Sequence, residues 1–212
     1  MRYSIIDTGE SRSFPAAHAF TQAASAEGEV TIILGKDAGR VFSPMKNKKA
    51  IVLELGIECL GAHTGESRGH EGSNVLGFAR FRLGDAPPTK LVELVKQPNT
   101  DPAALAAAKQ AFESAGLAVA VCNDFPGRIV ERLIRPYLNA ALRRLDEGLA
   151  TAEDLDTTLR LGLGYPEGPI ALLERTGLAA HFEVTQALHE ALGDAAYAPA
   201  RRARVAHRRR SQ

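Results

Sequence analysis

The sequence predicts an α/β domain with a parallel sheet, followed by an all-α domain. Short runs rich in β-branched residues alternate with helical segments and turns up to about residue 122, which is typical of parallel α/β folds. After Asp124, one amphipathic helical pattern follows another. We therefore expect an α/β domain over 1–122, a helical domain over 123–200 and a basic tail over 201–212 that is disordered.

The first half contains six segments with the length and β-branched content of buried strands. Between them, apolar spacing predicts a helix over Phe14–Ala24. An alanine-rich helix over Pro102–Ala115 is expected to be capped by Asp101 and stopped by Gly116. The segment Gly56–Gly72 is rich in Gly, His and Glu and predicts an open loop. The expected strands are Tyr3–Ile6, Val30–Leu34, Ala50–Leu55, Val75–Phe78, Lys90–Val95 and Leu117–Val121.

The second half predicts a series of capped helices. Pro126 suits the first turn of a helix that runs to about Gly148. Thr151 is placed to cap the next helix, because its hydroxyl can accept a backbone N–H while acidic residues follow. Pro169 opens a helix through Leu173, and a last helix covers His181–Leu192.

Composition gives no sign of a membrane or nucleic-acid protein. The net charge is +1 and no apolar run approaches the roughly 20 residues that span a bilayer. Cys59 and Cys122 form no metal-binding pattern, so free thiols and a cytoplasmic location are expected. The arginines of 201–210 could bind nucleic acid, but without interleaved aromatic residues a solvated tail is favoured. We expect no nucleic-acid partner and no metal.

Two motifs carry a resemblance to a known family. The run Asp-Phe-Pro-Gly-Arg-Ile-Val-Glu-Arg at 124–132 and the run Leu-Gly-Leu-Gly-Tyr-Pro-Glu-Gly-Pro at 161–169 resemble the C-terminal helical domain of the 3-hydroxyacyl-CoA dehydrogenases. The resemblance implies a shortened Rossmann-like sheet domain followed by that helical domain. It also implies NAD as cofactor, an acyl-CoA ligand, oxidation of 3-hydroxyacyl-CoA to 3-ketoacyl-CoA, and a homodimer formed through the helices.

The expected NAD motif is degenerate. In the run Ile-Ile-Asp-Thr-Gly-Glu-Ser-Arg at 5–12, only the middle glycine of Gly-x-Gly-x-x-Gly remains, as Gly9, while Asp7 and Arg12 replace the outer two. A carboxylate at Asp7 is unfavourable beside a pyrophosphate, so a turn without a ligand is favoured. Asp37 is the nearest acidic candidate for a ribose contact, although a turn residue is the plainer interpretation. Gly9 and Asp85 are the candidate cofactor contacts.

The residues that should oxidise an alcohol are mostly replaced. The family supplies a His–Glu pair, a Ser and an Asn, which act as base, orienting group and donors. By resemblance, Glu93 occupies the place of the glutamate, whereas Ala79 or Phe81 stands at the histidine, depending on the register. Ile57 stands at about the serine position. Glu131 stands at the asparagine, where a carboxylate cannot donate as an amide does.

Substitute roles are conceivable for several residues. Glu131 could act as a base, although an ion pair with Arg128, Arg132 or Arg135 is favoured. Glu93 without its histidine is interpreted as a retained structural acceptor. His63 and His70 could supply a base or bind zinc, but exposed loop histidines are the favoured interpretation.

Two functions follow from these alternatives. The chain is either a divergent oxidoreductase that uses Glu93 or Glu131, or a catalytically impaired relative that binds acyl-CoA or a partner subunit. The residues slightly favour the second.

Overall fold

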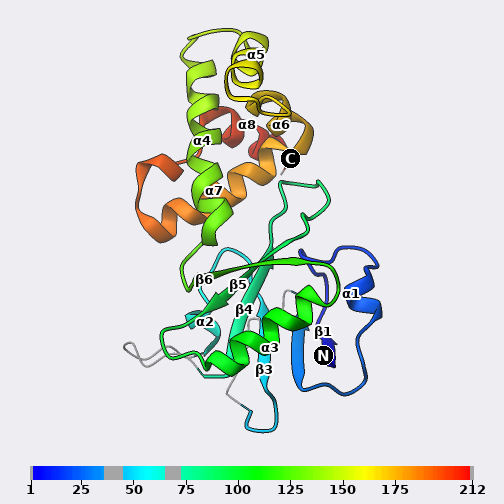
Figure 1. The fold of residues 1–212 in the computed structure, drawn as a ribbon. Coiled ribbons are helices and arrows are strands. Elements are labelled where there is room, and N and C mark those ends of the chain that lie inside the picture. Colours follow the sequence, from blue (N-terminus) through cyan, green and yellow to red (C-terminus); the bar gives the residue numbers. More distant parts are fainter. Residues whose placement is uncertain (1, 36–44, 65–72, 211–212) are drawn as a thin grey trace. The chain divides into compact units, whose positions relative to one another are not determined.

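The computed structural model describes residues 2–35, 45–64 and 73–210 (Figure 1). The chain divides into two compact units. The sheet unit comprises Met1–Arg82 and Pro88–Ile129, and the helical unit comprises Leu83–Pro87 and Val130–Gln212. The division therefore lies in the first turn of a long helix rather than at 122–124, and a short loop of the first half belongs with the helices. Asp37 and His70 lie outside the described residues.

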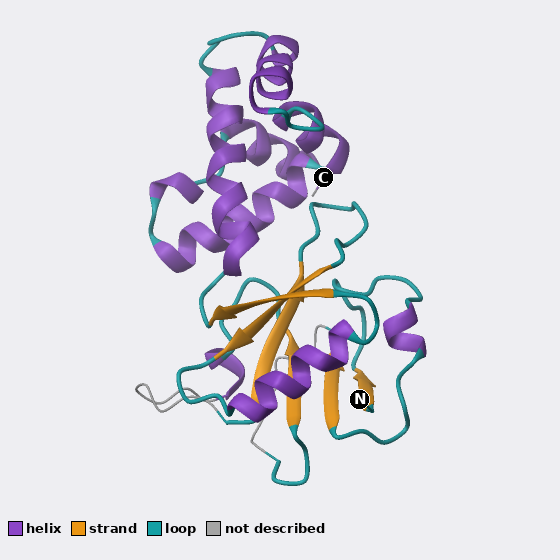
Figure 2. Ribbon diagram, viewed as in Figure 1, coloured by secondary structure: helices purple, strands orange, loops and turns teal. Residues whose placement is uncertain are grey.

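The sheet unit is built on six strands whose order in space follows their order in the sequence (Figure 2). The four strands β1 to β4 are parallel, β5 is antiparallel to β4, and β6 is parallel to β5. All six expected strands are confirmed. The antiparallel pair was not foreseen, yet only residues 81–90 separate its strands, fewer than a parallel crossover needs. The strands are β1 Tyr3–Asp7, β2 Val30–Leu34, β3 Ala50–Glu54, β4 Val75–Arg80, β5 Leu91–Lys96 and β6 Ala118–Asn123.

Helix α3, Pro102–Glu113, covers one face of the sheet and closes its main core (Figure 1). Its predicted cap is confirmed, since the Asp101 carboxylate accepts the N–H of Ala103 at 2.8 Å. Within the core, the rings of Phe20 and Phe78 each lie 5.0 Å from that of Phe112. Aromatic contacts of this kind add to the apolar burial that stabilises the unit.

Two short helices differ from the sequence-based expectation. Helix α1 covers only Ala19–Gln22, capped by His18, and not the predicted Phe14–Ala24. Phe14 lies in the core ahead of the helix, so its spacing from Phe20 reflects burial of both rings and not a helical period. Helix α2, Gly61–Thr64, lies within the segment expected to be an open loop.

The helical unit confirms the predicted series of helices after Asp124. Thr151 caps α5 as expected, accepting the N–H of Asp154 at 3.1 Å. No helix of the described residues is long and apolar enough to cross a membrane. The helices are α4 Arg128–Asp146, α5 Ala152–Leu163, α6 Pro169–Thr176, α7 Leu178–Leu192, the 3₁₀ helix η2 Ala195–Tyr197, and α8 Arg201–Arg210.

The basic C-terminal segment corrects one expectation. Residues 201–210 were expected to be a disordered tail, but they form helix α8, which packs against α7. Ala203 is fully buried there, and the Arg202 guanidinium donates to the Asp146 carboxylate at 2.7 Å. Arginine is a good helix former, and a small buried alanine lets the helix approach its neighbour. Charge alone therefore misled the prediction.

Candidate functional site

The β4–β5 pair places the retained glutamate opposite an alanine. Ala79 and Glu93 are register partners in this antiparallel pair, and both are buried. Residues directly opposite each other share a face of the sheet, with Cβ atoms about 4.5–5.5 Å apart. Phe81 lies beyond the end of β4. Of the two places left open for the missing histidine, the register favours Ala79, so a methyl group faces Glu93 where an imidazole would stand.

Glu93 has a clear structural task in the sheet unit. Its Oε1 accepts the backbone N–H of Ile129 at 2.9 Å, in the first turn of α4. The first N–H groups of a helix have no partner within the helix, and a carboxylate is favoured at this positive end. The contact supports the interpretation of Glu93 as a retained structural acceptor.

Ile57, the residue expected at about the serine position, is tied to the start of the same helix. The carbonyl of Ile57 accepts the N–H of Gly127 at 2.9 Å. The Arg128 guanidinium donates to the carbonyls of Gly56 and Glu58 on either side. The backbone is therefore held firmly, but the side chain of Ile57 offers no hydroxyl that could hold a carbonyl oxygen.

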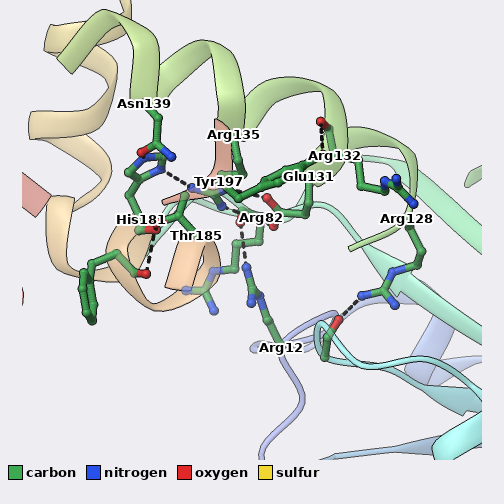
Figure 3. A network of polar contacts seen from close by, with 12 residues as sticks. Arg12, Arg82, Arg128, Glu131, Arg132, Arg135, Asn139, His181, Thr185 and Tyr197 are labelled. Carbon is green, nitrogen blue, oxygen red and sulfur yellow. Dashed lines mark hydrogen bonds and ion pairs between the residues drawn. The ribbon is translucent and has the colours of Figure 1, made fainter. Parts of the chain in front are cut away.

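In the helical unit, Glu131 is bound by a buried arginine (Figure 3). Arg135 is fully buried and donates to both carboxylate oxygens of Glu131. The Nε–Oε2 distance is 2.5 Å and the Nη2–Oε1 distance is 3.2 Å. The ion pair expected from the i, i+4 spacing is thereby confirmed with Arg135 as the partner. Because the guanidinium occupies both oxygens, Glu131 could accept a substrate proton only by weakening this pair. Its role as a base stays a prediction.

The arginine continues into a chain of buried polar groups that sequence reasoning missed. Arg135 Nη1 lies 2.9 Å from His181 Nδ1, and His181 Nε2 lies 3.0 Å from Asn139 Oδ1. A guanidinium can only donate, so Nδ1 accepts and the imidazole proton resides on Nε2. Asn139 then donates to the carbonyls of Ala196 and Ala198. The chain joins α4, α7 and η2, as the labelled side chains in Figure 3 show.

Burial keeps His181 neutral. Desolvation, followed by the positive charge of Arg135, lowers the pKa of His181 to about 3. A neutral imidazole is what the bond to Arg135 requires, so the network is consistent in charge and in donor direction. In the sequence, Asn139 and His181 are 42 residues apart, and nothing in their neighbourhoods indicates a contact. The one sequence signal of this network was the i, i+4 spacing of Glu131 and Arg135, which indicates an ion pair on one helix.

A cavity lies at the carboxyl edge of the first three strands, where open α/β sheets bind ligands. It measures about 400 Å³ and belongs entirely to the sheet unit. Gly9 lies near it and approaches Gly35 closely: a Cβ on Gly35 would come within 2.7 Å of the Gly9 nitrogen. The cavity is lined by Glu10, Ser11, Arg12, Gly35, Glu54, Leu55, Gly56, Glu58 and Arg82.

The backbone donors of this edge are engaged by carboxylates of the chain itself. Asp7 Oδ1 accepts the N–H of Gly9 at 3.0 Å. The buried Glu54 accepts the N–H of Ser13 at 2.6 Å and that of Gly35 at 2.9 Å. In a Rossmann site, such N–H groups and a helix N-terminus hold the pyrophosphate. Among residues 8–18 no helix begins, because α1 starts only at Ala19. These residues do not fit a dinucleotide, and Gly9 as a cofactor contact stays a prediction.

Asp85 belongs to the helical unit, in the loop Leu83–Pro87. Its N–H donates to the carbonyl of Thr176 at 3.3 Å. The preceding Gly84 has φ +55°, and a Cβ there would collide with the same carbonyl. Glycine is therefore required where the loop meets the end of α6. This geometry accounts for the loop, and a cofactor role for Asp85 stays a prediction.

His63 and the two thiols are also accounted for. The expectation that His63 is exposed is wrong: its side chain is 8% exposed and Nε2 lies 3.1 Å from Glu58 Oε1. Cys59 and Cys122 are half-buried free thiols. Burial, followed by the charge of Glu93, raises the pKa of Cys122 to about 11. In the described part of the chain, no three His, Cys, Asp or Glu side chains are grouped to hold a metal.

Comparison with known proteins identifies the helical part of the chain. Residues 127–210 match the model of the 3-hydroxyacyl-CoA dehydrogenase C-terminal domain. This part of the chain belongs to the family of that domain. It is 38% identical over 117 residues to a 3-hydroxybutyryl-CoA dehydrogenase of Bradyrhizobium diazoefficiens, covering 55% of this chain and 40% of the relative. It is 41% identical over 104 residues to the mitochondrial hydroxyacyl-coenzyme A dehydrogenase of Sus scrofa, covering 49% and 33%.

Solved structures of this dehydrogenase family confirm the predicted fold class. FadB2 of M. tuberculosis superposes with a TM-score of 0.69 at 24% identity, over 85% of this chain and 65% of that one. The (S)-3-hydroxybutyryl-CoA dehydrogenase PaaH1 of Ralstonia eutropha gives 0.68 at 23%, over 84% and 64%. The chain spans less than half the length of the curated relatives named above. These structures share the Rossmann-like sheet and the helical domain with this chain.

Proposed function

We propose that this member of the 3-hydroxyacyl-CoA dehydrogenase family binds an acyl-CoA without carrying out the family's alcohol oxidation. One observation carries the proposal: Ala79 presents a methyl group to Glu93, and Glu93 is engaged by the N–H of Ile129. A positioned base contributes about 10²–10⁴-fold to a proton-transfer step. Here the carboxylates of Glu93 and Glu131 are both held by hydrogen-bond donors of the chain itself.

A second function, NAD-linked oxidation of 3-hydroxyacyl-CoA, is favoured by the retention of Glu93. It requires Glu93 or Glu131 to serve as the base. For Glu93 this means giving up its helix contact, and for Glu131 it means weakening the buried pair with Arg135. It also requires NAD to displace Asp7 and Glu54 from the N–H groups they hold. These costs make the oxidation the weaker candidate.

The helical unit offers a surface for a second copy of the chain. Helix α5 has no buried residue, although its sequence is amphipathic. Burying such a face against its copy is the usual logic of a twofold dimer. We propose a homodimer through this face, in the cytoplasm, where the thiols Cys59 and Cys122 would stay reduced. The exposed apolar residues of the unit are Leu133, Leu149, Leu161, Leu163 and Tyr165.

Calorimetric titration of the purified chain separates the two functions. Acetoacetyl-CoA alone should give heat with a Kd in the micromolar range, and NADH alone should give none up to millimolar concentration. No heat from acetoacetyl-CoA would end the acyl-CoA proposal. Micromolar NADH binding, accompanied by consumption of NADH when acetoacetyl-CoA is added, would replace it with the oxidoreductase.

The double variant Ala79→His/Glu131→Asn is the matched test of the lost chemistry. It restores two family residues while leaving Glu93 and the backbone in place. If the wild type does not oxidise NADH in the presence of acetoacetyl-CoA and the variant does, the chain has kept its substrate site and lost only the reacting groups. Glu131→Gln is the control: unchanged turnover in any active form would exclude Glu131 as a base.

A further inference from the structure

The carboxyl edge of β1–β3 has one unusual property. After each of the three strands, a backbone N–H is bonded to a carboxylate of the same unit. Gly9 is held by Asp7, Gly35 by Glu54, and Gly56 by Glu58 at 2.9 Å. Loop N–H groups at such an edge normally bind ligand anions, since they concentrate positive partial charge. Here the protein provides the anions.

Glu54 is the centre of this arrangement. It is the last residue of β3, its side chain is buried, and its two oxygens bind different loops. Oε1 accepts from Ser13 in the loop after β1, and Oε2 accepts from Gly35 directly after β2. One carboxylate therefore ties together two loops that lie 41 and 19 residues away from it in sequence. In an open dinucleotide site, the loop after the first strand binds the pyrophosphate instead.

Two arginines share the cavity in which Glu54 lies. Arg12 and Arg82 line the same cavity as Glu54, and Arg12 donates to the carbonyl of Arg82 at 3.1 Å. The two guanidiniums bring positive charge to the cavity that Glu54 lines. Bonds from N–H groups to a carboxylate are stronger than those to a neutral acceptor. A phosphate that entered the cavity would find the N–H groups of Ser13 and Gly35 already bonded to Glu54.

We propose that Glu54 is a built-in substitute for a nucleotide phosphate, and that it closes this edge of the sheet to dinucleotides. The proposal goes beyond acyl-CoA binding and does not depend on it. Its direct consequence is that removing the carboxylate exposes a vacant anion site. That site should accept acetate, which replaces the deleted group, and inorganic phosphate, which replaces the nucleotide.

Thermal unfolding of Glu54→Ala, with and without added anions, tests the proposal. We expect the variant to lose about 5–15 °C in Tm, because two buried N–H groups lose their acceptor. Acetate or phosphate at tens of millimolar should restore several degrees compared with the same ionic strength of chloride. The wild type should show no such anion-specific gain. If only acetate raises the Tm of Glu54→Ala, the site accepts carboxylates and not phosphate. If phosphate raises the Tm as well, Glu54 stands in the place of a phosphate.

Glu54→Gln is the matched control, since its side chain fills the same space and excludes an added anion. It should be destabilised and not rescued. A folded Glu54→Ala that gains nothing from either anion would overturn the proposal. So would a wild type whose Tm rises with ADP or NADH, a result that does not require the alanine variant to fold. The calorimetric titration with acetoacetyl-CoA does not depend on the role of Glu54. A failure of acetoacetyl-CoA to bind would therefore count only against the proposed function.

Discussion

Ala79 and Glu93 face each other across the β4–β5 pair, so the glutamate that should orient a histidine faces a methyl group. Glu93 nevertheless has a structural role, because its Oε1 accepts the N–H of Ile129. Glu93 therefore acts as an acceptor for the first turn of α4. This structural role can be tested by stability measurements alone.

Glu93→Ala should lower the free energy of unfolding by about 1–3 kcal/mol, because the N–H of Ile129 loses its buried acceptor. Glu93→Gln should cost less, since an amide oxygen can accept the same bond. Urea denaturation followed by circular dichroism provides both values. Equal losses for the two variants would mean that the charge, and not the acceptor, is what the site requires.

Arg135→Ala should destabilise the protein by about 3–5 kcal/mol, since it leaves the buried Glu131 carboxylate without its partner. The exposed pair Arg144–Glu147, also at 2.5 Å, is the matched control. Arg144→Ala should cost about 0–1 kcal/mol. Similar losses from the two variants in urea denaturation would show that Glu131 and Arg135 are not a buried structural pair.

His181 should make stability fall as the pH drops from neutral. Its pKa is lowered to about 3 from an ordinary 6.5, so the unfolded chain binds a proton between these values that the folded chain does not. The stabilisation is fully present above pH 6.5 and is lost progressively below it, by about 2–3 kcal/mol between pH 8 and pH 4.5. His181→Gln should lose this component in pH-dependent urea titrations. An identical pH dependence in the variant would refute the assignment.

Cys122 should react slowly with thiol reagents. Burial, together with the charge of Glu93, raises its pKa to about 11, which leaves a small thiolate fraction at pH 8. In a Cys59→Ser background, alkylation of the folded protein should be roughly 100-fold slower than that of the urea-unfolded chain. Rates within a few-fold of each other would show that the thiol is accessible and ionisable.

Much of the fold follows from local sequence patterns. The six strands, the Asp101 cap and the Thr151 cap are encoded within a few residues, and all three features are confirmed. Helix α8 was missed because a run of arginines was judged by its charge, whereas the buried Ala203 and the contact with α7 decide its structure.

The candidate site was predictable only in part. Motif spacing indicated Glu93 and Glu131 as candidate site residues, which stay predictions. Their partners depend on contacts that sequence patterns do not encode: Ile129 lies 36 residues from Glu93, and Ser13 lies 41 residues from Glu54. The choice between Ala79 and Phe81 needed the strand register, which only the β4–β5 pairing supplies.

Absorbance measurements of NADH with the purified wild-type chain and acetoacetyl-CoA decide whether the chain carries out the family's redox reaction. We predict no loss of NADH above the rate without protein, since a methyl group lies opposite Glu93 and the carboxylates of Asp7 and Glu54 occupy the backbone donors. NADH consumption that rises in proportion to protein concentration would contradict the account.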